Sequence, residues 1–212
     1  MEREGDGTPG PAEDWGDVEA LQAKLASTPS RRTRDRMIEA AAVPLGKSGD
    51  PRAAEFLAEL VRDRSSTRRV NRAAIQGLKE AGRAAAPPVR GLLKDGVHDL
   101  GAVWVIGEVG SADDVELLLP LLRCRGLRLR YYTIMALDEL GDDARAVDGF
   151  EFALRDRRMF VREKALVALG KYYDDDELLE AVAQARASVP WYRLLTHHTY
   201  RQWARRHQSA RR

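Results

Sequence analysis

The sequence has 212 residues, of which 44% are apolar and only 7% aromatic. A chain rich in Ala, Leu and Arg with so few aromatic residues favours helices packed through small side chains over a β-sandwich. Its 35 basic and 33 acidic residues leave a net charge of only +2, which argues against binding of polyanions through bulk charge. Any electrostatic function must therefore come from where the charges are placed.

The N-terminal part of the chain predicts no targeting segment. Residues 1–14 are polar and rich in Gly and Pro, so we expect them to be disordered. Residues 15–30 predict a short amphipathic helix, in which Val18, Leu21 and Leu25 share a face. No apolar run approaches the about 20 residues of a membrane span, and the single cysteine, Cys124, cannot form an intrachain disulfide. We therefore expect a cytoplasmic protein with a reduced thiol.

A pattern with a period of about 30 residues runs through the rest of the chain. The recurring Leu/Ile positions are Leu45, Leu78, Ile106, Leu137 and Leu169, in steps of 33, 28, 31 and 32 residues. A small residue stands four positions earlier in each copy: Ala41, Ala74, Ala102, Thr133 and Ala165. A glycine stands four positions later in the first four copies: Gly49, Gly82, Gly110 and Gly141. Because residues four apart share a helical face, each copy predicts a buried stripe, a close helix contact, and a left-handed glycine that ends the helix.

A second helix is predicted after each of these first helices. Asp50 before Pro51 is typical of an N-cap followed by a first helical proline, and Ser111 with Asp114 is typical of a capping box. Further acidic starts are Asp142, Asp143 and residues 174–177. Pro120 should bend the second helix of the third pair. Pro44 and Gly77 predict weaker first helices in the first two pairs.

The last copy carries a family resemblance. Residues 160–170, FVREKALVALG, with Asp156 six positions before Arg162, resemble the bacterial HEAT-like repeats first described in phycobilin lyases. The resemblance covers residues 31–187 and implies an all-α solenoid of about five helix pairs. It also implies a ladder of Asp and Arg between repeats, so Arg130 and Arg162 should turn inward. It says little about function, because such repeats occur in lyases, hydroxylases, glycosylases and scaffolds.

The C-terminal residues 188–212 form a basic, aromatic segment. Tyr192, Leu195, Thr199 and Trp203 have the spacing of a helix that caps the array, and the alternative is that this helix is itself a binding element. His197 and His198 are adjacent, so on a helix they point about 100° apart and make a poor metal site. No phosphate loop, zinc motif or catalytic motif is present. We therefore expect no metal, no cofactor and no enzymatic activity.

Charge follows the repeat. The segments between predicted pairs are basic, except at residues 94–99, whereas the turns inside pairs are acidic. Helix ends and an internal ladder account for about two basic residues per repeat, which leaves an excess that we assign to function. We expect this excess to form an exposed edge at Arg64, Arg68, Arg69, Arg125, Arg128, Arg157 and Arg158.

Two functions fit this pattern. The first is a scaffold or regulator that binds a protein partner on a concave face built from the second helices. Its candidate residues are Glu55, Glu59, Arg90, Glu116, Arg123, Asp148, Glu151 and Glu180. The alternative is binding of nucleic acid or another polyanion along the arginine edge, in a relative of the HEAT-like DNA glycosylases. No glycosylase motif is clear enough to assign a catalytic residue.

Overall fold

The computed structural model describes residues 15–141 and 143–188. Within them the chain is all helical, with eleven α-helices, three short 3-10 helices and no strand. Residues 1–14, Asp142 and residues 189–212 lie outside the described part, and with them the predicted disorder, one acidic helix start, and nearly all of the C-terminal segment. The chain divides into two compact units between Ala85 and Ala86. The two units are described separately.

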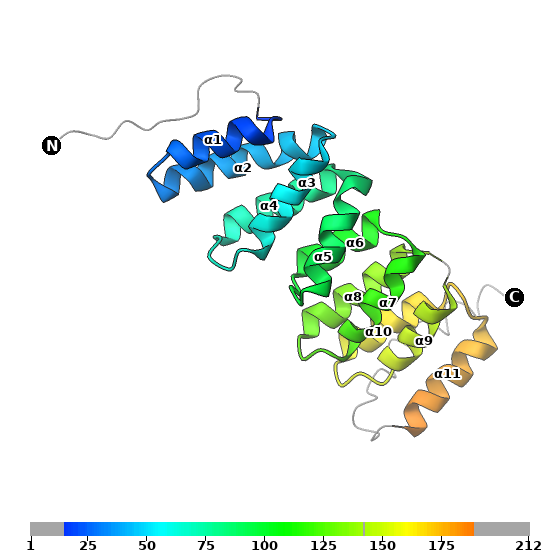
Figure 1. Ribbon diagram of the computed structural model, residues 1–212. Coiled ribbons are helices and arrows are strands. Elements are labelled where there is room, and N and C mark those ends of the chain that lie inside the picture. The colour runs from blue at the N-terminus through cyan, green and yellow to red at the C-terminus, as the bar shows by residue number, and fades with distance from the viewer. Residues whose placement is uncertain (1–14, 142, 189–212) are drawn as a thin grey trace, which may run out of the picture. The chain divides into compact units, whose positions relative to one another are not determined.

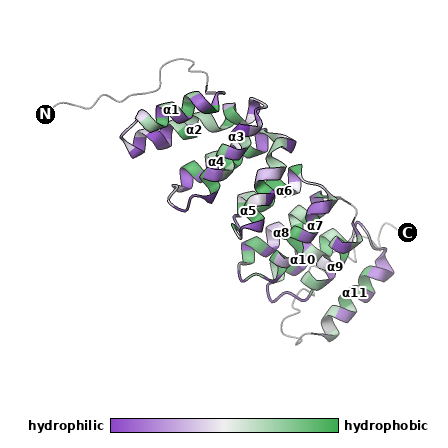
Figure 2. Cartoon of the chain, in the orientation of Figure 1, coloured by the Kyte–Doolittle hydropathy of each residue, from purple (hydrophilic) through white to green (hydrophobic). Residues whose placement is uncertain are grey.

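The first unit contains four α-helices (Figure 1). They are α1 (Val18–Ser27), α2 (Arg31–Lys47), α3 (Pro51–Arg62) and α4 (Arg68–Glu80), followed by a 3-10 helix η1 (Gly82–Ala85). The predicted short N-terminal helix is confirmed as α1, and the Asp17 side chain caps it by accepting the amides of Glu19 and Ala20. α2 packs along α4, and α3 covers both. Hydrophilic and hydrophobic residues interleave along these helices, as amphipathic packing requires (Figure 2).

Two glycines let α2 and α4 approach closely. A Cβ atom at Gly46 would overlap the carbonyl oxygen of Gly77, and one at Gly77 would overlap the carbonyl oxygen of Ala42. The weakening expected at Pro44 and Gly77 does not interrupt either helix. α2 continues through Pro44 to Lys47, and the intrinsic cost of Gly77 is offset because only glycine allows this backbone contact.

The second unit contains the remaining helices. They are α5 (Ala86–Lys94), α6 (Leu100–Val109), η2 (Ala112–Asp114), α7 (Val115–Leu118), η3 (Leu119–Arg123), α8 (Leu127–Glu139), α9 (Ala144–Ala153), α10 (Met159–Leu169) and α11 (Asp175–Ala187). α6, α8 and α10 pack side by side in chain order, while η3 and α9 pack against this layer. Along residues 31–187 the helices follow one another in the order that the sequence predicted.

The repeating core positions are buried as predicted. All five recurring Leu/Ile residues are at most 1% exposed, and so is Phe150 on α9. The small residues four positions before them are fully buried as well. The 30-residue period therefore identified the core of both units correctly.

Most predicted helix boundaries are confirmed. Asp50 caps α3, and capping boxes form at Ser111–Asp114 and Asp174–Glu177. Gly49, Gly82 and Gly141 are left-handed, with φ of 73°, 56° and 100°. Gly110 contradicts the prediction, because its φ is −77°. A side chain there would collide with the Ile106 carbonyl and the Asp114 carboxylate, so this glycine serves close packing against the capping box.

Pro120 has a larger effect than the predicted bend. The second helix of the third pair is divided into α7, which has four residues, and η3, a five-residue 3-10 helix that contains the proline. Proline has no amide hydrogen and clashes with the preceding turn, which favours an interruption of the α-helix at this position. η3 ends at Arg123, immediately before the turn that leads to α8. No helix in the described residues is long and apolar enough to cross a membrane.

Candidate anion-binding groove

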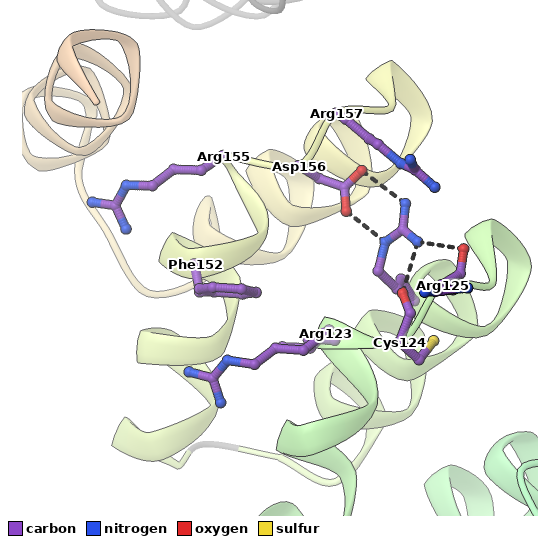
Figure 3. A pocket seen from close by; sticks show the side chains of 9 residues that line it. Arg123, Cys124, Arg125, Phe152, Arg155, Asp156 and Arg157 are labelled. Atoms are coloured by element: carbon purple, nitrogen blue, oxygen red, sulfur yellow. Dashed lines mark hydrogen bonds and ion pairs between the residues drawn. The ribbon is translucent and has the colours of Figure 1, made fainter. Parts of the chain in front are cut away.

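An open groove lies in the second unit, where the turn from η3 to α8 faces the turn from α9 to α10 (Figure 3). Its volume is about 390 Å³. The lining residues are Leu122, Arg123, Cys124, Arg125, Arg130, Phe152, Arg155, Asp156 and Arg157. Five of these nine are arginines, and Asp156 is the single carboxylate among them.

The buried ion pair between Arg130 and Asp156 connects the two turns. Arg130 Nε and Nη2 donate to the two carboxylate oxygens of Asp156 at 2.6 and 3.0 Å. Arg130 Nη1 also donates to the carbonyl oxygens of Cys124 and Arg125, at 3.0 and 3.1 Å. The Arg130 side chain is only 5% exposed. The prediction that this arginine turns inward toward an acidic residue is confirmed.

Asp156 organises its own turn as well. Its carboxylate accepts the backbone amide of Arg158 at 2.7 Å, and its carbonyl oxygen accepts a bond from Arg162 Nη1 at 2.8 Å. Arg162 is buried, as predicted, and this burial lowers the pKa of its guanidinium below the ordinary value. Asp156 is therefore fully used by the fold, and its charge is compensated by Arg130.

Four further arginines line the groove. Arg123 and Arg155 are 32 residues apart in the sequence, and so are Arg125 and Arg157, so each pair occupies equivalent turns of successive repeats. Arg123 and Arg155 extend on the side of Phe152, whereas Arg125 and Arg157 lie on the other side, near Asp156 (Figure 3). Within the described residues none of these four arginines forms an ion pair. The groove thus carries an uncompensated positive charge.

An aromatic ring lies in this charged groove. Phe152 on α9 is 40% exposed, and the guanidinium carbon of Arg123 lies 4.8 Å from its ring centroid, within the range of a cation–π contact. Arg155 is held by a hydrogen bond of 3.0 Å from its Nε to Ser188 Oγ, at the end of α11. One end of the groove is therefore partly apolar, formed by Phe152 with two positioned guanidinium groups.

The seven arginines predicted for the exposed edge are all exposed. Arg125 and Arg157 belong to the groove, while Arg128 and Arg158 lie next to its turns without lining it. The other three, Arg64, Arg68 and Arg69, belong to the first unit, at the turn between α3 and α4. The structure therefore places two of the seven predicted arginines, Arg125 and Arg157, in one groove.

Several of the acidic residues predicted for a concave face have partners within the chain. Glu59 pairs with Arg62 at 2.6 Å, and Glu116 pairs with Arg145 at 3.3 Å. The half-buried Glu151 accepts a hydrogen bond from the Tyr173 hydroxyl at 2.5 Å, which raises the pKa of Tyr173 to about 12.

Two other candidates of that face differ in how they are used. Arg90 is paired with the buried Asp114, through bonds of 2.5 and 2.8 Å, so it serves the fold. Glu55 on α3 is exposed. In the second unit, the arginine groove therefore offers charges for a ligand more readily than the acidic residues do.

Sequence reasoning did not combine Arg123, Phe152 and Arg155 into one site. The repeat step of 32 residues between the two arginines was visible, and Phe152 does not belong to the apolar stripe of Val147, Phe150 and Leu154. An aromatic residue outside the buried stripe of its helix was the available signal. Its meaning depends on the neighbouring turn, which only the tertiary structure supplies.

No group of three metal-ligating side chains occurs in the part of the chain that the structure describes. His197 and His198 lie outside that part. Comparison of the sequence with protein-family models and with curated proteins finds no match.

Proposed function

We propose that this chain is a HEAT-like helical-repeat scaffold that binds the acidic segment of a protein partner in the arginine groove and has no catalytic activity. One observation carries the proposal: four arginines from equivalent turns line one groove, whose single carboxylate is already paired with Arg130. The planar guanidinium matches a carboxylate through two parallel hydrogen bonds, so such a groove suits Asp and Glu side chains.

The repeat architecture supports this function. The described chain is all helical, its recurring Leu/Ile positions are buried, and α6, α8 and α10 pack in series in the second unit. Helical repeats of this kind present extended surfaces for partner binding. The proposed compartment is the cytoplasm, where a half-buried single cysteine such as Cys124 stays reduced.

Nucleic acid is the second candidate, because all seven predicted arginines of the edge are exposed. The groove itself favours a shorter ligand. It spans only two turns, and residues 94–99, at the preceding boundary of the same unit, contain no arginine. Affinity for nucleic acid grows with the number of neutralised phosphates, so a short cluster favours a short acidic peptide segment.

The test compares two labelled ligands by fluorescence anisotropy at low and moderate salt. One is a ten-residue glutamate peptide and the other is a single-stranded oligonucleotide. The variant replaces all four groove arginines with glutamine: R123Q, R125Q, R155Q and R157Q. Since an exposed charge pair contributes about 0.2–1 kcal/mol, losing four should cost about 0.8–4 kcal/mol and weaken peptide binding by about fourfold at least and roughly a thousandfold at most.

The matched control removes the same charge elsewhere. Exposed arginines of the first unit are replaced in it: R32Q, R34Q, R36Q and R83Q. We expect this variant to bind the peptide as the parent does. A control variant that loses as much affinity as the groove variant would contradict the groove, and stronger, salt-sensitive binding of the oligonucleotide would support the second candidate.

A further inference from the structure

The groove also has a feature that recognition of acidic residues alone does not use. We infer that the acidic segment bound there carries an aromatic side chain, which packs against Phe152 between Arg123 and Arg155. This inference rests on the proposed function and adds the chemical nature of the bound segment. Its evidence is the position of Phe152, the contact that holds Arg123, and the division of the groove into two ends.

Phe152 contributes little to the core of the second unit. Phe150, two residues earlier on the same helix, is fully buried, whereas Phe152 is 40% exposed and points into the groove (Figure 3). Residues two apart on a helix point in widely different directions, so one of the two rings faces the core and the other faces the ligand side. The exposed ring lies among guanidinium groups that would otherwise attract only charged ligands.

The two ends of the groove differ in chemistry. Arg125, Arg157 and the Arg130–Asp156 pair form a polar end, while the Phe152 ring lies at the other end with Arg123 and Arg155 (Figure 3). A ligand made only of carboxylates would pair with the arginines but would leave the exposed part of the Phe152 ring unburied. A segment with an aromatic residue between acidic residues would use both properties of this end.

The arrangement of Arg123 favours an aromatic side chain over a stacked base. Its guanidinium lies over one face of the Phe152 ring. The exposed remainder of the ring then suits the edge-to-face contact that aromatic side chains adopt with one another. Such pairs contribute about 0.5–1.5 kcal/mol beyond the burial of apolar area, so the aromatic residue should strengthen binding by about tenfold.

The experiment uses two peptides of equal charge and the full chain. Each peptide has six glutamates, with a central phenylalanine in one and a central alanine in the other. The parent should bind the phenylalanine peptide about tenfold more tightly than the alanine peptide. In Phe152→Ala this difference between the two peptides should disappear, because neither peptide can then contact the ring.

A matched control exists in the same unit. Phe160 on α10 is 62% exposed and does not line the groove, so Phe160→Ala should keep the full preference for the phenylalanine peptide. Circular dichroism of both variants checks that the fold is retained.

The outcomes separate this inference from the function on which it rests. If the parent binds both peptides equally, the aromatic contact is refuted while the acidic-segment scaffold stands. If the parent binds neither peptide, both proposals fail. If a single-stranded oligonucleotide binds more tightly than either peptide and Phe152→Ala weakens it, the ring serves base stacking and the inference is overturned.

Discussion

Replacing Asp156 with alanine tests the ion pair that connects the two turns of the groove. The change removes both bonds to Arg130, of 2.6 and 3.0 Å, and the 2.7 Å bond to the backbone amide of Arg158. Arg130 keeps its bonds to the carbonyl oxygens of Cys124 and Arg125, but its charge stays buried without a counter-ion. The expected result is a large loss of stability in the second unit.

The magnitude follows from burial. The side chains of Arg130 and Asp156 are 5% and 10% exposed, so the uncompensated guanidinium cannot regain water without disrupting the turn. Removing one partner of a buried ion pair costs about 3–5 kcal/mol. Replacing both partners by apolar residues of similar volume is often close to neutral, so Arg130→Met with Asp156→Leu should recover most of the loss.

Hydrogen exchange followed by mass spectrometry is the suitable assay, because it reports the second unit separately from the first. Peptides from α8 and α10 should lose protection in Asp156→Ala. The control is Glu116→Gln, which breaks the ion pair between Glu116 and Arg145. The side chain of Glu116 is 63% exposed and that of Arg145 is 42% exposed. An exposed pair contributes up to about 1 kcal/mol, so this control should change protection little.

Two results would refute the reasoning. A loss below about 1 kcal/mol in Asp156→Ala would mean that Arg130 tolerates the absence of its partner, contrary to the cost expected for a buried charge. A double variant as unstable as Asp156→Ala would mean that the turn needs this carboxylate for reasons other than charge pairing, such as its bond to the Arg158 amide.

Three further predictions concern the core, the close helix contact and a titrating group. Leu137→Ala removes a fully buried side chain and should lower the free energy of unfolding by about 2–5 kcal/mol in urea; a loss below about 1 kcal/mol would contradict the core. Gly77→Ala should destabilise the first unit, because the new methyl group would overlap the α2 backbone. Gln76→Ala, at the exposed neighbouring site, should leave the stability nearly unchanged. A stabilising effect of Gly77→Ala would disprove the close contact between the two helices. Tyr173 should ionise near pH 12 by phenolate absorbance and closer to its ordinary value of 10.0 in Glu151→Gln. Because the pKa of Tyr173 is raised in the folded state, the contribution of its hydrogen bond to the stability of the fold is complete below pH 10 and is lost as the pH rises toward 12. An unchanged Tyr173 titration in Glu151→Gln would refute the hydrogen bond as the cause of the raised pKa.

Local signals in the sequence were sufficient for much of the helical structure. Asp50, Ser111 with Asp114, and Asp174 with Glu177 begin helices where the sequence predicted them, because an N-cap depends on a side chain and on amides two or three residues away. The period of Leu/Ile positions identified the core, since it follows from helix geometry and from the need to bury one face.

Signals that depend on a neighbouring element were misread or missed. From the sequence alone, Gly77 predicts a weaker helix, whereas the structure shows that it allows close contact with α2. Gly110 predicts a left-handed helix end, whereas the structure shows that it leaves room for the Asp114 carboxylate. Pro120 predicted a bend, whereas the structure has a change from α-helix to 3-10 helix at that position.

The candidate site divides in the same way. The sequence by itself predicted that arginines recur in equivalent turns, that Arg125 and Arg157 are exposed, and that Arg130 turns inward, because the repeat spacing puts equivalent side chains in equivalent turns. Only the tertiary structure decided that Arg123, Phe152 and Arg155 line one groove with them, since that depends on how α9 packs against η3 and α8. The sequence thus specifies which side chains reach the surface, and the packing of successive helices decides which of them meet.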